Sequence, residues 1–201
     1  MVSWDERFRT GEYPTEPEPA ALLAENIDWF PDGRALDVAA GTGRNAVFLA
    51  ESGYQVDAID QSRAGLRIAR ENAFERGTSI NGIQADAHEF EYPTERYDVI
   101  SISFFRTLDR LGDIKEALKP GGVLYYQHHL RTTDAVEIGP STDRYRFQAN
   151  EMLHACLDLT VLRYQEFTED VDGRTAANVA IIARNTRGPR QSYPPLAGRG
   201  S

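Results

Sequence analysis

A glycine-containing turn follows the first strongly apolar run of the chain and limits the possible folds more than any other segment. Residues 36–46 read LDVAAGTGRNA, with Gly41 and Gly43 between a run of β-strand character and a run with helical spacing. Glycines at such a junction allow positive φ and close backbone contact, and the free N–H groups of the following helix can bind a ligand. The segment predicts a strand–turn–helix unit with a ligand at the turn.

Apolar runs alternate with helical segments through the first two thirds of the chain. This alternation is typical of right-handed βαβ units, which build a mainly parallel sheet with helices on both faces. Ser62 is a predicted helix N-cap. The patterns predict strands at residues 35–39, 55–60, 80–85, 97–103 and 123–127, and helices at residues 20–29, 44–52, 62–76 and 109–118.

The final third of the chain changes character. Residues 148–157 are predicted to form a helix, and residues 159–166 and 179–184 to form strands on either side of the turn-rich segment 170–174. That connection is too short for a crossover helix, so the two strands either pair as a hairpin or lie apart. We therefore predict that an otherwise parallel sheet ends in one antiparallel strand.

Composition narrows the classes of partner. The formal net charge of -9, without a run of basic residues, argues against binding to nucleic acid. The sequence shows neither a secretory leader nor an apolar run near the roughly 20 residues needed to cross a bilayer, so we expect a cytoplasmic protein without a membrane partner. Lys115 and Lys119 are the only lysines among 22 basic residues, which suits either a high-salt cytoplasm or a GC-rich genome.

Three aspartates at successive predicted strand ends suggest the kind of ligand. The spacing Gly41-x-Gly43-x-x-Ala46 fits a nicotinamide-dinucleotide fingerprint, but a carboxylate at Asp37 would repel the pyrophosphate. S-adenosylmethionine has a sulfonium and an ammonium group and no phosphate, so it suits an acidic site. Asp37 can order the turn or reach the amino acid part through water, while Asp60 can bind the ribose hydroxyls and Asp86 the adenine amino group.

Five segments, in this order, resemble motifs of the class I S-adenosylmethionine-dependent methyltransferases: LDVAAGTGRNA, VDAIDQS, QADAHEF, YDVISIS and LKPGGVLYYQ. The resemblance covers about residues 20–184. It implies an α/β fold, a Rossmann-like three-layer sandwich whose seven-stranded, mostly parallel sheet has an antiparallel last strand. Ala39 stands where many members have glycine. The cofactor-binding residues implied are Trp4, Tyr13, Asp37, Ala39, Gly41, Gly43, Arg44, Asn45, Asp60, Gln61, Asp86, Ala87 and Ser103.

A narrower resemblance concerns the branch that contains tellurite-resistance and thiopurine methyltransferases. It rests on GRNAVFLAESGYQVDAIDQS and on the N-terminal segments WDERF and GEYP, which are similar to a segment that caps the cofactor in that branch. An aromatic lid would favour a sulfonium through its π-faces and would exclude water. The resemblance implies a cap segment at residues 1–19 and a methyltransferase domain at 20–184. The tail at 185–201 is rich in Gly, Pro and Arg and has too little apolar content to pack, so we expect it to be disordered.

Catalysis of methyl transfer depends mainly on alignment, because the methyl group of a sulfonium is already activated. A general base is needed only when the acceptor must lose a proton. His128 and His129 follow the predicted fifth strand and are the candidates, and only one of them should face the cofactor because adjacent strand residues point to opposite faces. These histidines have no Cys or carboxylate at ligand spacing, so no metal site is expected.

The acceptor should be recognised by residues 104–106 and by the polar segment 131–147, since loops at the carboxyl edge of such a sheet carry substrate contacts. The arginines there either bind an anion or are ordinary solvated side chains. The sequence predicts methyl transfer to a small molecule, such as a thiol or a metalloid oxyanion. An NAD(P)-dependent oxidoreductase and a non-catalytic cofactor-binding module are the alternatives, and oligomeric state is left open. The candidate substrate residues are Phe104, Arg106, Arg131, Tyr145 and Arg146.

Overall fold

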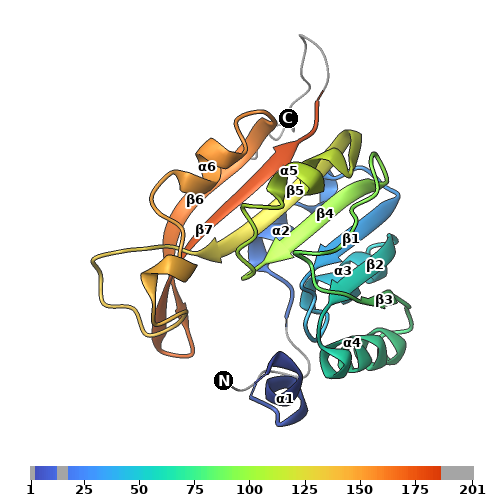
Figure 1. Ribbon diagram of the computed structural model, residues 1–201, viewed down its shortest axis with the longest axis horizontal. Helices are drawn as coiled ribbons and strands as arrows, with labels where there is room; N and C mark the ends of the chain where they lie inside the picture. Colours follow the sequence, from blue (N-terminus) through green and yellow to red (C-terminus); the bar gives the residue numbers. More distant parts are fainter. Residues whose placement is uncertain (1–2, 13–17, 187–201) are drawn as a thin grey trace, which may run out of the picture.

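The computed structural model describes residues 3–12 and 18–186, and its strands form the middle of three layers (Figure 1). The strand order is β3-β2-β1-β4-β5-β7-β6. Strands β1 to β5 pair in parallel, and β7 pairs antiparallel with both β5 and β6. The predicted Rossmann-like sheet is therefore confirmed. The strands are β1 (Arg34–Val38), β2 (Gln55–Asp60), β3 (Asn81–Gln84), β4 (Tyr97–Ser103), β5 (Leu118–His129), β6 (Thr160–Val171) and β7 (Arg174–Arg184).

Helices cover both faces of the sheet, as expected for βαβ units (Figure 1). Leu23 of α2, Leu49 of α3 and Leu66 of α4 pack into one core, and Ile114 of α5 and Met152 of α6 pack into the other. The helices are α1 (Trp4–Arg9), α2 (Ala21–Glu25), α3 (Arg44–Glu51), α4 (Arg63–Glu75), α5 (Leu111–Glu116) and α6 (Glu151–Ala155), with 3-10 turns η1 (Ile27–Trp29) and η2 (Asp143–Tyr145).

Several element boundaries differ from the sequence prediction for local reasons. The single helix predicted at residues 20–29 is interrupted at Asn26, whose side chain donates to the carbonyl of Leu22 and competes with the helical bonds. Strand β5 begins at Leu118, five residues early, because Leu118 pairs with Tyr97 before the register shift in β4. The predicted N-cap is confirmed, since Ser62 Oγ accepts from the N–H of Gly65 at 3.0 Å.

The C-terminal strands form the hairpin that the turn-rich segment predicted. Asp172 and Gly173 have φ values of 55° and 76°, the pair of left-handed residues that a type I′ turn requires. Both strands run closer to the turn than predicted, so β7 begins at Arg174 and not at residue 179. The antiparallel strand lies between β5 and β6 and not at the sheet edge, which places Asn178 directly opposite His129.

The chain ends lie partly outside the described residues. Tyr13 falls in the undescribed segment 13–17, and the predicted disordered tail is described only at residues 185 and 186. At Asn185 the backbone N–H donates to the carbonyl of Gly122 at 2.8 Å. Within residues 3–12 and 18–186, no helix has the length and apolar composition needed to cross a membrane.

Candidate functional site

The carboxyl ends of the parallel strands meet at one edge of the sheet, and Asp60 lies there at the end of β2. Its Oδ2 accepts from the N–H of Gly41 at 2.8 Å, and its Oδ1 accepts from the N–H of Ser62 at 2.7 Å. Burial raises the pKa of this carboxyl above its ordinary value, and the two backbone donors oppose that shift. A carboxylate has about four acceptor positions. Two positions therefore remain on Asp60 for a ligand at the turn.

Asp37 is buried at the end of β1, under the first turn of α3. Its Oδ2 accepts from the N–H of Ala46 at 3.0 Å, which satisfies one of the free donors at the helix start. Burial raises the pKa of Asp37 to about 7, although bonds from Ser101 and Ala46 oppose the shift. Of the two roles predicted for this residue, the structure supports ordering of the turn.

The two glycines of the turn are needed for packing within the protein. Gly41 has φ 54°, and an added Cβ would lie 3.1 Å from the Phe8 ring. Gly43 has φ 87°, and an added Cβ would lie 2.7 Å from the Cβ of Ala69 in α4. Close backbone approach was predicted to serve a ligand. The structure shows that it also brings Phe8 of α1 and Ala69 of α4 against the turn, while the N–H of Gly41 is fixed by Asp60.

Ala39 also has a left-handed backbone, with φ 56°. This conformation explains why glycine fits the position better than alanine, because a Cβ in the left-handed region costs about 1 kcal/mol. We expect Ala39→Gly to raise the free energy of unfolding by about 1 kcal/mol, measured by urea denaturation. The neighbouring Ala40→Gly is the control and should destabilise the protein, since Ala40 is buried and lacks a positive φ. A loss of stability in Ala39→Gly would contradict the claim that the left-handed backbone of Ala39 is strained.

Other predicted cofactor residues lie around the turn in different environments. Asn45 Nδ2 donates to Ser103 Oγ at 2.8 Å and to Ser101 Oγ at 3.1 Å, so Asn45 and Ser103 tie α3 to the end of β4. Gln61 and Asp86 are exposed beside the ends of β2 and β3. Asp86 Oδ1 accepts only from the N–H of His88 among the described residues, which leaves acceptor capacity at the predicted adenine side. Ala87 is buried.

The N-terminal helix α1 lies against α4, next to the glycine turn (Figure 1). Asp5 Oδ1 accepts from Ser62 Oγ at 2.9 Å and from the N–H of Ala64 at 2.8 Å, so Asp5 joins α1 to the start of α4. Phe8 is buried against Gly41, and Trp4 stacks on Phe8 with the ring centroids 6.0 Å apart. Asp5 and Phe8 were missed as individual site residues, because their contacts are formed with parts of the chain more than 30 residues away.

Removal of the Asp5 contacts should loosen α1. We expect Asp5→Ala to weaken binding of S-adenosylhomocysteine several-fold, since two hydrogen bonds that hold the segment beside the turn are lost. Calorimetric titration measures this affinity. Glu6→Ala is the matched control, because the Glu6 carboxylate pairs only with Arg9 of the same exposed helix among the described residues. Equal affinities of the two variants would show that α1 is not part of the site.

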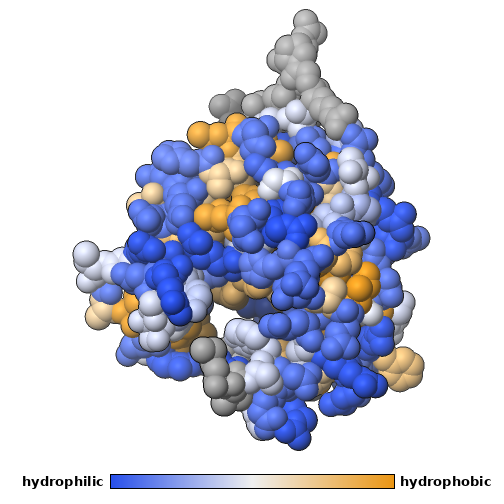
Figure 2. Space-filling view, viewed as in Figure 1, coloured by the Kyte–Doolittle hydropathy of each residue, from blue (hydrophilic) through white to orange (hydrophobic). Residues whose placement is uncertain are grey.

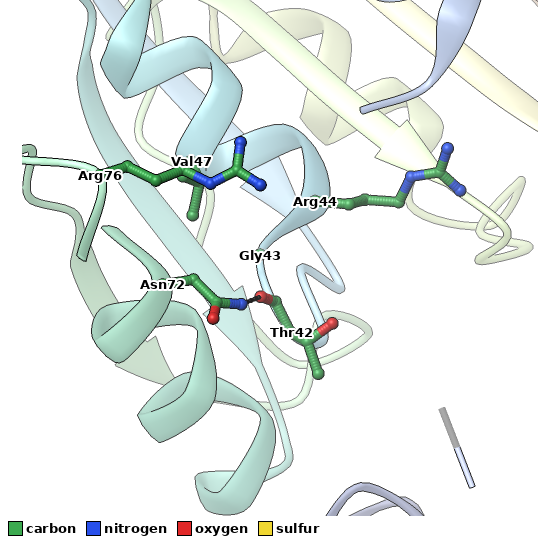
Figure 3. Close-up of a pocket in the computed structure, with 6 residues that line it drawn as sticks. All are labelled: Thr42, Gly43, Arg44, Val47, Asn72 and Arg76. Carbon is green, nitrogen blue, oxygen red and sulfur yellow. Dashed lines mark hydrogen bonds between the residues drawn. The ribbon is translucent and has the colours of Figure 1, made fainter. Parts of the chain in front are cut away.

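Arg44, the first residue of α3, reaches the opposite side of the turn. A small pocket of about 10 Å³, too small for a nucleoside, lies between α3 and α4. Figure 3 shows that the Arg44 side chain extends away from Asn72 and Arg76. The Arg44 guanidinium lies 5.8 Å from the centre of the Phe104 ring, and its Nε is buried without a hydrogen-bond partner among the described residues. A cation in this state is suited to an anionic group of a ligand.

The two candidate histidines are the last residues of β5 and not the first residues after it. His128 is buried against Phe147 and accepts the N–H of His129 on its Nδ1 at 2.7 Å. His129 is half-buried on the α3 side, and its ring stacks on that of Phe104 with the centroids 4.6 Å apart. Burial lowers the pKa of His128 to about 3 and that of His129 to about 4, so both rings are neutral at pH 7.

The predicted substrate residues separate into two groups. Arg146 is buried and donates to the carbonyls of Pro140, Leu130 and Ile138, so its predicted role as an anion-binding residue does not fit the structure. Arg106 is paired with Glu151 at 2.6 Å. The residues that stay accessible at this end of the sheet are Phe104, Arg131 and Tyr145, with Phe104 in a left-handed conformation (φ 56°).

Figure 2 shows that the surface is hollowed on this side, between the β6–β7 hairpin and α1. Phe104, at the end of β4, holds its left-handed conformation through a hydrogen bond from its N–H to the carbonyl of Gln127. Such strain at a non-glycine residue often marks a functional site.

Within the described parts of the chain, no three His, Cys, Asp or Glu side chains are arranged to hold a metal ion.

Comparison with known proteins matches residues 35–122 to a family model described as a methyltransferase domain. The matched segment contains the glycine turn, Asp60 and Asp86. Residues 35–122, somewhat less than half of the chain, are therefore similar to a methyltransferase domain.

Two relatives match over part of their length. The chain is 32% identical over 125 residues to the ubiquinone/menaquinone biosynthesis C-methyltransferase UbiE of Azotobacter vinelandii, covering 57% of this chain and 49% of the relative. It is 32% identical over 108 residues to the demethylmenaquinone methyltransferase of Renibacterium salmoninarum, covering 51% of this chain and 44% of the relative. The chain thus spans about half the length of these relatives.

Solved structures share the fold at low identity. TehB from Haemophilus influenzae superposes with a TM-score of 0.73 and 19% identity, covering 90% of this chain and 66% of that one. A SAM-dependent methyltransferase from Methanosarcina mazei gives a TM-score of 0.69 and 15% identity, covering 85% of this chain and 99% of that one. These similarities show the fold. They do not identify the methyl acceptor.

Proposed function

We propose that this chain is an enzyme that transfers the methyl group of S-adenosylmethionine to a small-molecule acceptor. The observation that carries the proposal is the buried Asp60 carboxylate, which fixes the glycine turn and keeps two acceptor positions for the hydroxyls of a ribose. Asp86 would accept the adenine amino group, and the Arg44 guanidinium, whose Nε has no hydrogen-bond partner among the described residues, would bind the carboxylate of the amino acid part. Bound S-adenosylmethionine supplies a methyl group already activated by its sulfonium.

The acceptor would enter between Phe104, His129 and the β6–β7 hairpin. The resemblance to the tellurite-resistance and thiopurine branch favours a thiol or a metalloid oxyanion, and the likeness to TehB agrees with it at the level of the fold. The names of the two relatives instead favour a carbon acceptor in a quinone precursor. The exposed aromatic ring of Phe104 suits a flat or soft acceptor of either kind.

A transfer assay with radiolabelled S-adenosylmethionine tests this proposal. The acceptor panel contains thiols, metalloid oxyanions, phenols, amines and carboxylates, together with a demethylated quinol precursor. We expect transfer to at least one acceptor, and we expect none in Asp60→Ala. Tight binding of the cofactor without transfer to any acceptor would contradict the enzymatic function and favour a cofactor-binding module.

A further inference from the structure

His129 lies where β5 ends and faces β7 across the sheet. In the antiparallel register, His129 is directly opposite Asn178, and Glu169 of β6 lies diagonally beyond Asn178. Asn178 is fully buried and is the only polar residue between Ala176 and Ala183. A polar side chain in such an apolar run must be hydrogen-bonded, so its partners reveal its role.

The hydrogen bonds form a chain from a carboxylate to the imidazole. Asn178 Nδ2 donates to Glu169 Oε1 at 2.6 Å, and Asn178 Oδ1 lies 3.0 Å from His129 Nδ1. The ionised carboxylate only accepts, which fixes the amide with Nδ2 toward Glu169 and Oδ1 toward His129. Because Oδ1 can only accept, Nδ1 of the neutral imidazole must carry the proton, and Nε2 must carry the lone pair.

Nε2 of His129 is left available by this arrangement. It has no hydrogen-bond partner among the described residues, and it is not one of their buried unpaired atoms, so it reaches solvent. The His129 ring stacks on Phe104, over which Arg44 also lies. The lone pair is therefore presented at the carboxyl edge of the sheet, next to the glycine turn.

We propose that Asn178 and Glu169 are positioning residues that lock His129 in its Nδ1–H form, so that Nε2 takes the proton from a hydroxyl or thiol acceptor during methyl transfer. The proposal deepens the proposed function and rests on it. It selects His129 over His128, whose Nδ1 already accepts a backbone N–H and whose ring is buried on the other face of the sheet.

The proton balance is simple. A lone pair on the acceptor oxygen or sulfur forms the bond to the methyl carbon, the carbon–sulfur bond of the donor breaks, and its electron pair stays on sulfur, which becomes a neutral thioether. The acceptor heteroatom gains positive charge as this bond forms, so its proton becomes strongly acidic. A weak neutral base is sufficient at that stage. His129 Nε2 receives the proton, Glu169 stabilises the imidazolium through Asn178, and water later removes the proton.

The first test reads the tautomer by NMR of the full chain labelled with ¹⁵N-histidine, in which the two ring nitrogens have distinct shifts. The wild type should show His129 as Nδ1–H at pH 7. In Glu169→Lys, an ammonium donor should turn the Asn178 amide around and convert His129 to Nε2–H, whereas Glu169→Gln, whose amide can accept or donate, should populate both tautomers. Glu166→Lys on the same strand is the control, since Glu166 bonds to Tyr164 and Asn150.

The second test measures turnover with a thiol or hydroxyl acceptor from the transfer assay. At saturating donor, Glu169→Lys should lower kcat about 100-fold, and Glu169→Gln should lower it less, because part of the molecules keep the Nδ1–H form. If Glu169→Lys does not fold, Asn178→Ala replaces it and should populate both tautomers. A wild-type Nε2–H form, or a tautomer or kcat that Glu169→Lys or Asn178→Ala leaves unchanged, would overturn the proposal. Failure of the chain to bind S-adenosylhomocysteine would instead refute the proposed function, with the tautomer readout intact.

Discussion

Asp60→Ala is expected to weaken the binding of S-adenosylhomocysteine by at least about 100-fold, or about 3 kcal/mol. The loss has two causes. The ribose hydroxyls lose a charged acceptor, and the N–H groups of Gly41 and Ser62 lose the carboxylate that fixes the turn. Calorimetric titration of the folded variant measures the affinity, and circular dichroism shows that the fold is kept.

Asp98→Ala separates loss of binding from loss of stability. Asp98 stands near the start of β4, at the opposite edge of the sheet, where its Oδ2 accepts from the N–H of Arg34 at 2.8 Å and from Lys119 at 2.7 Å. Removal of this carboxylate should lower the free energy of unfolding and leave the affinity unchanged. Equal affinity in the wild type and Asp60→Ala would remove Asp60 from the cofactor site.

The second large effect concerns Asp37 and pH. Burial raises the pKa of this carboxyl to about 7, so the folded state keeps the proton over a range in which the unfolded state, with its pKa near 3.8, has lost it. The free energy of unfolding should therefore fall by roughly 1.4 kcal/mol per pH unit between about pH 4 and pH 7, or about 4 kcal/mol in all, through this group alone. Asp37→Asn removes the titration.

The difference in unfolding free energy between the wild type and Asp37→Asn isolates the titration of Asp37 from that of all other groups. Urea denaturation of the wild type and of Asp37→Asn, from pH 4 to pH 8, should give a stability difference that moves in favour of the asparagine variant as pH rises and levels off above pH 7. An amide oxygen can still accept the N–H of Ala46, so the helix start is kept. Parallel pH profiles of the two proteins would contradict the raised pKa.

The fold and the cofactor edge were predictable because their rules are local and topological. Strand–helix alternation determines a parallel sheet, and parallel strands bring their carboxyl ends to one edge. Asp60 could therefore be placed beside Gly41 without coordinates, and the structure shows the hydrogen bond between them. The hairpin was equally accessible, since Asp172-Gly173 is a strong type I′ signal.

The part of the site that would hold the methyl acceptor depends on the pairing register of strands that are distant in sequence. No local sequence pattern determines this register. Asn178 reaches His129 only because β7 inserts between β5 and β6 in one particular alignment. Its isolated polarity within an apolar strand was a signal that sequence reasoning had available and did not use. Arg146 was misassigned for the same reason, because the three carbonyls that bind it are brought together by the folding of residues 130–146.

The cofactor assignment is tested most directly by calorimetric titration of the full chain with S-adenosylhomocysteine and, separately, with NAD. The carboxylates of Asp60 and Asp86 beside one glycine turn favour a cation-bearing nucleoside and disfavour a pyrophosphate. We predict saturable binding of S-adenosylhomocysteine at one site and no heat of binding with NAD. Tight binding of NAD without a response to S-adenosylhomocysteine would contradict the proposed methyltransferase and support an oxidoreductase.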